Sequence, residues 1–396
     1  MTATLLERKT KWRRARWGRN GGRHYLKAAL YGEISDPKAA FYRKIQVFRV
    51  FFDTGTVNMT IQQDERLEAL SGWLVETLKL TVEAVEPASS DASFRRYFRA
   101  YSNGMSFIVM DAPPSRENVR PFIRVAALLR NAGVQAPEII ATDEERGFLL
   151  LTDFGTRSYL DALNAASADR LYEDALDALA LMQSGVDIET SGLPPYDERL
   201  LGVELDLFRD WFLGLLLGLA LDPSDSEVFD DLKQRLIASA LEQPRVCVHR
   251  DYHSRNLMVT ERLNPGVLDF QDAVIGPVTY DLVSLLRDCY ISWPPSMVEV
   301  WMIDHYTRLC ETGVLDSVDL DLFRRWFDLM GMQRHLKAIG IFARLKLRDG
   351  KPGYLKDIPR TMNYVTEICR RYPEFAGFLS FLDNRVLPRM SLDKVT

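Results

Sequence analysis

The fold of this 396-residue chain is indicated by one stretch, CVHRDYHSRNLMVTERLNPGVLDFQD at residues 247–272. Its two apolar runs, residues 257–259 and 266–268, are separated by a polar loop, and this pattern predicts a short hairpin. Asn256 stands immediately before the first run and Asp269 immediately after the second. We therefore expect the hairpin to carry an amide and a carboxylate that can act together.

The spacing of the polar residues within this stretch points to a particular chemistry. His249-Arg250-Asp251 is followed at the fifth place by Asn256, which is the HRDxxxxN spacing of the protein-kinase catalytic loop, and Asp269 lies on the next strand. Phosphoryl transfer requires Mg²⁺ on hard oxygen ligands and a hydroxyl aimed in line. We predict that Asp251 accepts the hydroxyl proton or orients the hydroxyl, and that Asn256 and Asp269 hold Mg²⁺ under the phosphates of ATP.

Other interpretations of these residues stay open. Asp251 and Asn256 could cap their own loop as part of a buried polar turn, with no catalytic role. His253 either packs this loop or touches the substrate, and packing is the simpler interpretation. Another aspartate, Asp281, lies twelve residues after Asp269, where a helix is expected to begin.

The residues before this stretch predict a small strand-rich lobe. After a helix with leucines at helical spacing, three strands with tight turns fall between residues 80 and 114. A helix over 118–131 and two more strands follow, the second ending at Asp153. The later residues are largely helical. We expect an α+β, bilobal protein-kinase-like fold with a nucleotide-binding lobe at 59–154 and a larger helical lobe, with the catalytic and metal-binding loops, at 155–396.

The phosphate-binding features of an ordinary kinase are missing. No GxGxxG is present, and the equivalent turn is small and polar, so Ser90, Asp91 and Ser93 are predicted to line the phosphates with N–H groups and hydroxyls. FIVMDA stands where a kinase strand carries VAIK, so the usual lysine is absent. Arg95 and its neighbours on the preceding strand are the substitutes, unless they only form a solvated strand face. Glu117 either pairs one of these arginines or favours a helix N-terminus.

A second kinase-like triplet, Asp153-Phe154-Gly155, spells DFG about a hundred residues too early. By position, Leu151 and Thr152 close the last strand of the small lobe, where a kinase hinge offers backbone groups to adenine. The metal-binding equivalent of DFG is therefore Asp269-Phe270-Gln271.

The composition excludes several classes of protein. Hydrophobic residues make up 47% of the chain and charged residues 27%, as in ordinary globular proteins. The four cysteines are far apart with no CxxC pair, which suits a reducing cytosol. The longest apolar run, residues 211–221, is too short to cross a bilayer and predicts a buried core helix. We expect a cytoplasmic protein with no membrane partner.

The amino-terminal arm differs from the rest of the chain. Residues 1–58 carry a net charge of +9 and have no clear periodicity, whereas the remainder is acidic. Such an arm is either a disordered or non-native extension, with the functional chain starting near Met59, or a basic tail for nucleic acid. We favour the extension, and a nucleic-acid partner is not expected.

VHRDYHSRN resembles the HxDxHxxN motif of the aminoglycoside phosphotransferase superfamily, and GVLDFQDAVIGPVTYDLVSLLRD resembles its continuation. The resemblance implies supporting roles for His249, Asp272 and Asp281. The stretches DASFRRYFR, MDAPP, LLLTDFG and MQRHLKAIGIFARLKLRDGKPGYLKDIPR are similar in more detail to bacterial cell-wall sugar kinases, over residues 60–390. That likeness implies ATP- and Mg²⁺-dependent phosphorylation of the anomeric hydroxyl of N-acetylmuramate and N-acetylglucosamine in peptidoglycan recycling. A nucleotidyltransferase would act next on the sugar 1-phosphate.

The resemblance also places the substrate against helices of the large lobe. Candidate contacts there are Glu204, His253, Arg334 and Lys337. A carboxylated sugar would suit Arg334 or Lys337, although a stabilising salt bridge is an equal alternative for each. Two other functions stay open: a kinase for another small alcohol, of aminoglycoside, choline or homoserine type, and a pseudokinase binding module suggested by the missing strand lysine.

Overall fold

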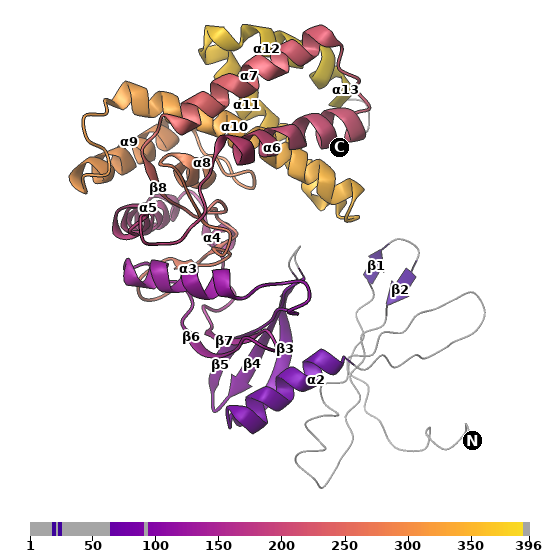
Figure 1. The fold of residues 1–396 in the computed structure, drawn as a ribbon, viewed down its shortest axis with the longest axis vertical. Helices are drawn as coiled ribbons and strands as arrows, with labels where there is room; N and C mark the ends of the chain where they lie inside the picture. The colour runs from indigo at the N-terminus through magenta and orange to yellow at the C-terminus, as the bar shows by residue number, and fades with distance from the viewer. Residues whose placement is uncertain (1–17, 21–22, 26–63, 91–93, 391–396) are drawn as a thin grey trace. The chain divides into compact units, whose positions relative to one another are not determined.

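The structure is a computed structural model that describes residues 18–20, 23–25, 64–90 and 94–390 (Figure 1). The predictions about the arm at 1–58 and about a start at Met59 lie almost entirely outside these residues. Within the arm, strands β1 (Gly18–Asn20) and β2 (Arg23–Tyr25) pair antiparallel. The chain divides into two compact units, of which the first runs to Val119 and includes Glu138–Asp153, and the second contains the rest.

A five-stranded antiparallel sheet forms the first unit, in the order β3-β4-β5-β7-β6. Its strands are β3 (Val82–Ser90), β4 (Arg96–Ser102), β5 (Met105–Asp111), β6 (Ile139–Asp143) and β7 (Phe148–Thr152). Asn103 and Gly104 connect β4 to β5 with positive φ angles of 51° and 76°, as a tight hairpin turn requires. The five strands predicted from the sequence are therefore all confirmed.

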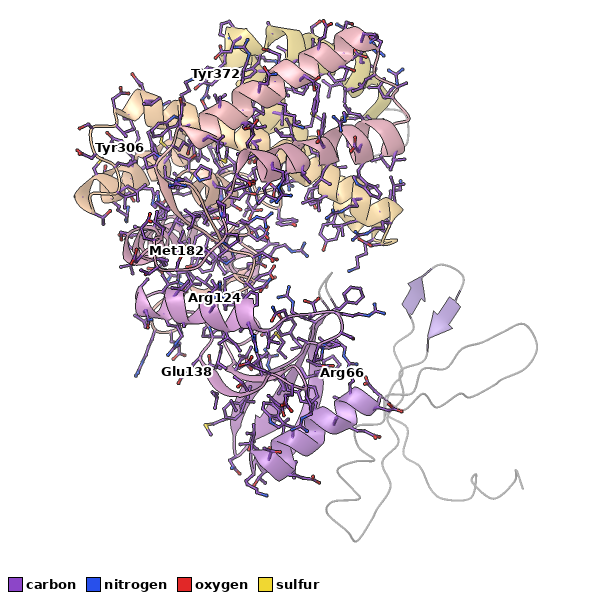
Figure 2. The ribbon with its side chains drawn as sticks, in the orientation of Figure 1. Arg66, Arg124, Glu138, Met182, Tyr306 and Tyr372 are labelled. Carbon is purple, nitrogen blue, oxygen red and sulfur yellow. The ribbon has the colours of Figure 1, made fainter. Side chains whose placement is uncertain are left out.

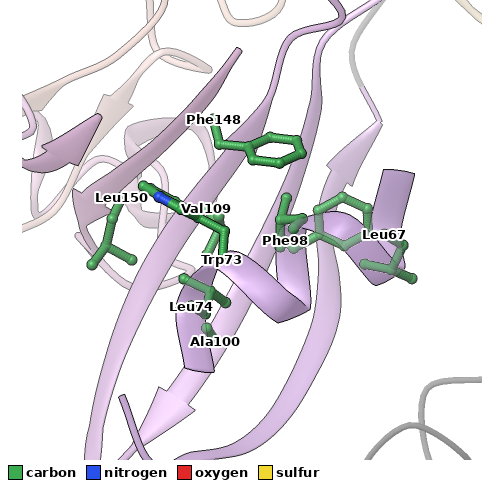
Figure 3. Close-up of a cluster of buried hydrophobic side chains, with 9 residues drawn as sticks. Leu67, Trp73, Leu74, Phe98, Ala100, Val109, Phe148 and Leu150 are labelled. Carbon is green, nitrogen blue, oxygen red and sulfur yellow. The ribbon is translucent and has the colours of Figure 1, made fainter. Parts of the chain in front are cut away.

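One helix covers this sheet. Helix α2 (Glu65–Gly72) begins at Asp64, whose carboxylate accepts the N–H of Leu67, and continues as the π-helical turn η1 (Trp73–Thr77). The predicted leucine stripe faces the sheet: Leu67, Leu70, Trp73 and Leu74 pack against Phe98, Ala100, Val109, Phe148 and Leu150 (Figure 3). This apolar cluster fixes the helix on the sheet, because burial of apolar surface is the main stabilising contribution in such a small unit.

The second unit is mainly helical and carries two short hairpin-like sheets. Its α-helices are α3 (Arg120–Asn131), α4 (Tyr159–Ala162), α5 (Ala168–Gly185), α6 (Glu198–Leu207), α7 (Pro223–Leu241), α8 (Tyr280–Leu286), α9 (Pro295–Glu311), α10 (Leu320–Leu347), α11 (Ile358–Arg371), α12 (Ala376–Phe381) and α13 (Leu387–Met390). The tighter or wider turns η2 (Phe208–Leu216), η3 (Pro352–Asp357), η4 (Pro373–Phe375) and η5 (Leu382–Val386) connect them. Strand β8 (Arg245–Val248) pairs with β11 (Val274–Pro277), and β9 (Leu257–Met258) pairs with β10 (Gly266–Val267).

Helix α3 is inserted after the third strand of the sheet, as predicted, but it packs within the second unit. The ring of Phe122 lies 4.7 Å from the ring of Phe270, measured between centroids. The expected helix at 211–221 also differs in form. The π-helical turn η2 ends at Leu216, and Leu215 is 61% exposed, so only part of this run is core.

Helix α10 is the central element of the second unit. It contacts α6, η2, α7, α8 and α11 (Figure 1), and it is buried along most of its 28 residues. Gly340 lies where α10 approaches the junction of α6 and η2, and a Cβ atom there would meet the backbone carbon of Leu207 at 2.4 Å. Charged side chains are rarely buried unless they have a partner. Three charged side chains of this helix are buried, namely Asp328, Arg334 and Lys337. No helix among the described residues is long and apolar enough to span a membrane.

Candidate active site

The predicted catalytic loop joins the two short sheets of the second unit. Strand β8 ends at Val248, the loop runs from His249 to Asn256, and the hairpin of β9 and β10 follows. Met258 pairs with Gly266 and Leu257 with Val267, which is the hairpin expected from the two apolar runs. This arrangement brings Asn256 and Asp269 to the same end of the hairpin.

His249 connects the loop to the strand that precedes Asp269. Its ring is fully buried, with Nε2 3.0 Å from the carbonyl oxygen of Leu268 and Nδ1 3.2 Å from the N–H of Asp251. The first contact requires Nε2 to donate and the second requires Nδ1 to accept, so one neutral tautomer satisfies both. Burial lowers the pKa of His249 to about 4, which keeps that neutral form at neutral pH. The predicted supporting role of His249 thus has a geometric basis.

Asp281 holds the turn immediately before Asp251. Its buried carboxylate accepts the N–H of His249 at 2.6 Å and the N–H of Arg250 at 3.0 Å. Arg250 has a φ of 77°, a left-handed conformation that costs a non-glycine residue energy. Burial raises the pKa of Asp281 to about 7, and the two N–H donors oppose that rise. The carboxylate stabilises the unusual backbone that directs Asp251.

Asp251 presents a carboxylate that no described residue hydrogen-bonds. Its backbone donates to His249 and accepts from the amide of Asn256, so the residue is fixed while its side chain stays available. Burial opposes ionisation, but the nearby charges of Lys337 and Arg334, together with His253 and His249, outweigh it and lower the pKa of Asp251. An ionised and unshared carboxylate can accept a proton from a bound hydroxyl.

Asn256 and Asp269 lie side by side, with Asn256 Nδ2 3.4 Å from Asp269 Oδ2. Asp269 has a φ of 64°, so a second residue of this site is in the left-handed region. Gln271 Nε2 donates to Asp269 Oδ1 at 2.8 Å, while Gln271 Oε1 is buried without a hydrogen-bond partner among the described residues. The cluster therefore offers carboxylate and amide oxygens, which is the donor set that Mg²⁺ prefers.

A buried charge network surrounds Glu204 on α6. Its carboxylate accepts from Tyr196, Arg250, Gln333 at 3.2 Å and Lys337 at 2.9 Å. Burial opposes the negative charge, but Lys337 and Arg250 outweigh it and lower the pKa of Glu204. Four donors engage the carboxylate that was predicted to contact the substrate, so its visible role is to fix Arg250 and Lys337, which both bond Oε1.

A small pocket of about 90 Å³ opens beside Asp251. Three of the four predicted substrate contacts, His253, Arg334 and Lys337, line it, whereas Glu204 does not line it and pairs with Lys337. His253 is 9% exposed, and its ring packs edge-on against Tyr290 with centroids 5.4 Å apart. The remaining lining residues are Arg250, Tyr280, Cys289, Tyr290, Ala338, Ile341 and Phe342.

Several residues of this region were missed from the sequence. Arg250 and Tyr280 line the pocket, and each is adjacent to a predicted residue, Asp251 or Asp281, which is the signal that could have identified them. Gln271 follows Asp269 by two residues and supplies an amide oxygen that the kinase-like spacing alone does not indicate. Asp272, which was predicted to support the site, is exposed, and no described residue bonds its side chain.

The arginines of the first unit are engaged with acidic partners. Arg99 donates two hydrogen bonds to the carboxylate of Asp153, at 2.6 and 3.0 Å. The aspartate of the early DFG triplet therefore forms an ion pair within the first unit. Arg96 pairs with Asp111, and Arg66 of α2 (Figure 2) bonds the same carboxylate.

Arg95 lies next to Glu117, with Nε 3.9 Å from Oε2. Glu117 also accepts the N–H of Phe94 at 3.1 Å. The ion pair with Arg95 agrees with the prediction that this glutamate pairs an arginine.

The other predicted nucleotide contacts are less visible. Asp91 and Ser93 lie outside the described residues, and only the backbone of Ser90, which pairs with Arg96 in the sheet, is described. Leu151 is buried, and Thr152 exchanges hydrogen bonds with Glu138 across the sheet. Leu151 and Thr152 stay predictions for the adenine contact.

Comparisons with known proteins agree with this geometry. Residues 84–311 match the model of the phosphotransferase enzyme family. The chain is 48% identical over 325 residues to the N-acetylmuramate/N-acetylglucosamine kinase of Pseudomonas putida, covering 80% of this chain and 95% of that protein. It is 41% identical to the protein of the same name from Neisseria meningitidis, covering 74% of this chain and 88% of that protein.

Solved structures share the fold. An aminoglycoside 2'-phosphotransferase-IIIa in complex with GDP has a TM-score of 0.54 at 16% identity, with 78% of this chain and 100% of that chain covered. A choline kinase from Streptococcus pneumoniae has a TM-score of 0.51 at 12% identity, with 76% and 99% covered. The predicted α+β kinase-like fold and the predicted superfamily are confirmed.

Proposed function

The chain belongs to the phosphotransferase enzyme family, and we propose that it transfers the γ-phosphoryl group of ATP to the anomeric hydroxyl of N-acetylmuramate and N-acetylglucosamine. The high identity to kinases named for these two sugars supports the choice of substrate. The unshared carboxylate of Asp251, next to the Asn256–Asp269 pair, supports the reaction type and carries the proposal.

Asp251 is the proposed acceptor of the hydroxyl proton. As the anomeric oxygen forms its bond to the γ-phosphorus, the bond from that phosphorus to the β–γ bridging oxygen breaks, and ADP leaves. The proton passes from the sugar hydroxyl to Asp251, whose lowered pKa makes it an ionised base at neutral pH. His249 and Asp281 act on this step indirectly, because they fix the backbone on either side of the loop.

Asn256 and Asp269 would hold Mg²⁺, with Gln271 as a third oxygen donor within the same cluster. The donor set fits, because Mg²⁺ is bound in proteins by one or two carboxylates together with amide oxygens, waters and substrate phosphates. The buried and unpartnered Oε1 of Gln271 supports a cation at this position. Bound there, the ion would neutralise charge on the phosphates of ATP.

We further propose that Arg95, held by Glu117, replaces the missing strand lysine. Arg96 and Arg99 form closer ion pairs with Asp111 and Asp153 and so have structural partners of their own.

The product, a sugar 1-phosphate, is the substrate class of nucleotidyltransferases, which make nucleotide sugars. We place the reaction in the cytoplasm because its phosphoryl donor is ATP.

The test is a coupled ADP-release assay on the full chain with each of the two sugars, with choline and with an aminoglycoside, in the presence of Mg²⁺ or EDTA. We expect Mg²⁺-dependent turnover with the amino sugars and a phosphorus NMR signal of a sugar 1-phosphate. Turnover with choline or the aminoglycoside alone would overturn the substrate, and nucleotide binding without turnover of any acceptor would indicate a binding module.

A further inference from the structure

Arg334 is a buried cation without a carboxylate partner. It lies on α10 and is 6% exposed, yet none of the described carboxylates forms an ion pair with it. Its only described hydrogen bond runs from Nη1 to the Sγ atom of Cys289 at 3.5 Å, and its Nε is buried with no partner. Burying a guanidinium in this state is costly, because its lost hydration is not replaced. A ligand that supplies an anion would remove this cost.

The acidic residues around Arg334 are engaged with other groups. Glu204 is held by Arg250 and Lys337. Asp288 accepts the N–H and hydroxyl of Ser254 and the N–H of Tyr290. In the folded protein, the carboxylates of Glu204 and Asp288 are therefore already bonded to other groups. The carboxylate of Asp251 is the proposed acceptor of the proton from the reacting hydroxyl.

The two cations predicted to meet a carboxylated sugar are thereby distinguished. Lys337 donates to Glu204 at 2.9 Å and to the hydroxyl of Tyr280 at 2.8 Å, so it already has an ion-pair partner and a second hydrogen bond. Arg334 lines the same pocket as Asp251, forms no ion pair with a described carboxylate, and has a buried Nε without a hydrogen-bond partner. A guanidinium presents a planar set of donors that a carboxylate can accept with both oxygens.

We propose that Arg334 binds a carboxylate on the acceptor sugar and so determines recognition of acidic amino sugars. The inference rests on the proposed function, and it adds the residue that distinguishes the two acceptors. N-acetylmuramate carries a lactyl ether with a carboxylate where N-acetylglucosamine has only a hydroxyl. Arg334 therefore contributes a contact to the first sugar that the second sugar cannot make.

The experiment compares kcat/KM for N-acetylmuramate, its neutral methyl ester and N-acetylglucosamine in the unaltered protein, Arg334→Met and Arg334→Lys. Arg348→Met is the matched control, because this arginine caps the same helix but its side chain is 56% exposed and pairs with the adjacent Asp349. Calorimetric binding of each sugar is measured on the same four proteins. Melting temperatures establish that the variants are folded.

We expect Arg334→Met to lower the ratio of kcat/KM for N-acetylmuramate to kcat/KM for N-acetylglucosamine by about 10- to 100-fold, the contribution of a charged hydrogen bond. A loss common to both sugars cancels in this ratio, which is needed because the charge of Arg334 also lowers the pKa of Asp251. The unaltered protein should prefer the acid to its methyl ester, and this preference should vanish in Arg334→Met and shrink in Arg334→Lys. An equal loss on both sugars, or no loss on either, would overturn the inference. The ester comparison needs no variant, so a misfolded Arg334→Met still leaves a decisive result.

The two proposals fail in different ways. If the unaltered protein phosphorylates neither sugar but binds N-acetylmuramate through Arg334, only the proposed function is wrong. If it phosphorylates both sugars with no preference for the acid over the ester, only the role of Arg334 is wrong. If it binds neither sugar, both are wrong.

Discussion

The carboxylate of Asp281 accepts the N–H of Arg250 at 3.0 Å and so stabilises a left-handed residue immediately before the proposed base. The same carboxylate accepts the N–H of His249 at 2.6 Å. Two N–H donors on one buried carboxylate constrain both peptide units that lead to Asp251. Asp281 is therefore a positioning residue, and its effect should be seen in turnover more than in substrate binding.

Asp281→Asn tests this role. An amide oxygen accepts more weakly than a carboxylate, and its NH₂ group would face one of the two N–H donors. We expect kcat to fall by about 10- to 100-fold with KM for the sugar changed less than threefold, because the side chain of Asp281 bonds the backbone that leads to Asp251 and is not itself in the lining of the pocket. Asp231→Asn, an exposed position paired with Arg235 on α7, is the matched control. A parallel rise in KM would show that Asp281 shapes the pocket instead.

Removing the proposed base should have a larger effect. Asp251→Asn keeps the size of the side chain and the backbone contacts to His249 and Asn256, so the fold and nucleotide binding should be retained. We expect kcat to fall by about two to four orders of magnitude, the usual contribution of a positioned acid–base group. Single-turnover measurements at saturating sugar would check the chemical step directly. Turnover near that of the unaltered protein would remove Asp251 from the mechanism.

The metal site predicts an order of effects. Asp269→Asn retains a side chain that tolerates the positive φ at this position but loses the negative charge, so Mg²⁺-dependent binding of ATP should weaken strongly. Asn256→Ala removes a neutral ligand and should weaken it less. Calorimetry with ATP in Mg²⁺ and in EDTA separates the metal-dependent part. Undiminished binding of MgATP by the Asp269 variant would contradict the assignment.

Gly340 predicts a packing limit on α10. A methyl group there would overlap the backbone of Leu207 and Phe208, and backbone atoms cannot move aside as a flexible side chain can. We expect Gly340→Ala to lower the free energy of unfolding by about 1–3 kcal/mol or more, as overpacked cores do. Gly353→Ala, where a Cβ meets no atom within 4 Å, is the matched control. Equal unfolding midpoints in urea for the two variants would show that the helices adjust without cost.

The sequence predicted those features that are local along the chain. The five strands, helix α2 and the β9–β10 hairpin follow from periodicity and turn residues, and the spacing from His249 to Asp269 predicted the loop they support. The Glu204 network was not predictable, because Tyr196, Arg250, Gln333 and Lys337 come from distant segments that only the helical packing brings together. For the same reason, nothing in the sequence distinguished the paired Lys337 from the unpaired Arg334.

Buried histidines predict how stability depends on pH. Burial lowers the pKa of His249 to about 4 and that of His305 and His335 to about 3, the last two with help from nearby arginines. In the unfolded chain each would titrate near the ordinary value of about 6.5. Between pH 6.5 and 4 the unfolded state therefore binds more protons than the folded state, and the free energy of unfolding falls as the pH falls. Asp281, whose pKa burial raises to about 7, acts in the opposite direction over the same range, because the folded state holds its proton.

Taken by themselves, these three histidines and Asp281 leave a difference of about two protons near pH 5, or roughly 3 kcal/mol per pH unit. His253, whose pKa burial also lowers, acts in the same direction as the three histidines. His305→Gln isolates one of them. His305 is fully buried away from the catalytic loop, and its Nε2 lies 2.9 Å from Oε1 of Gln183, a contact that a glutamine amide could replace. We expect the variant to lose about 1.4 kcal/mol per pH unit of this slope, measured by urea unfolding at pH 5, 6, 7 and 8, with the value at pH 8 reporting any packing cost separately. An unchanged slope would mean that His305 titrates alike in the folded and unfolded states.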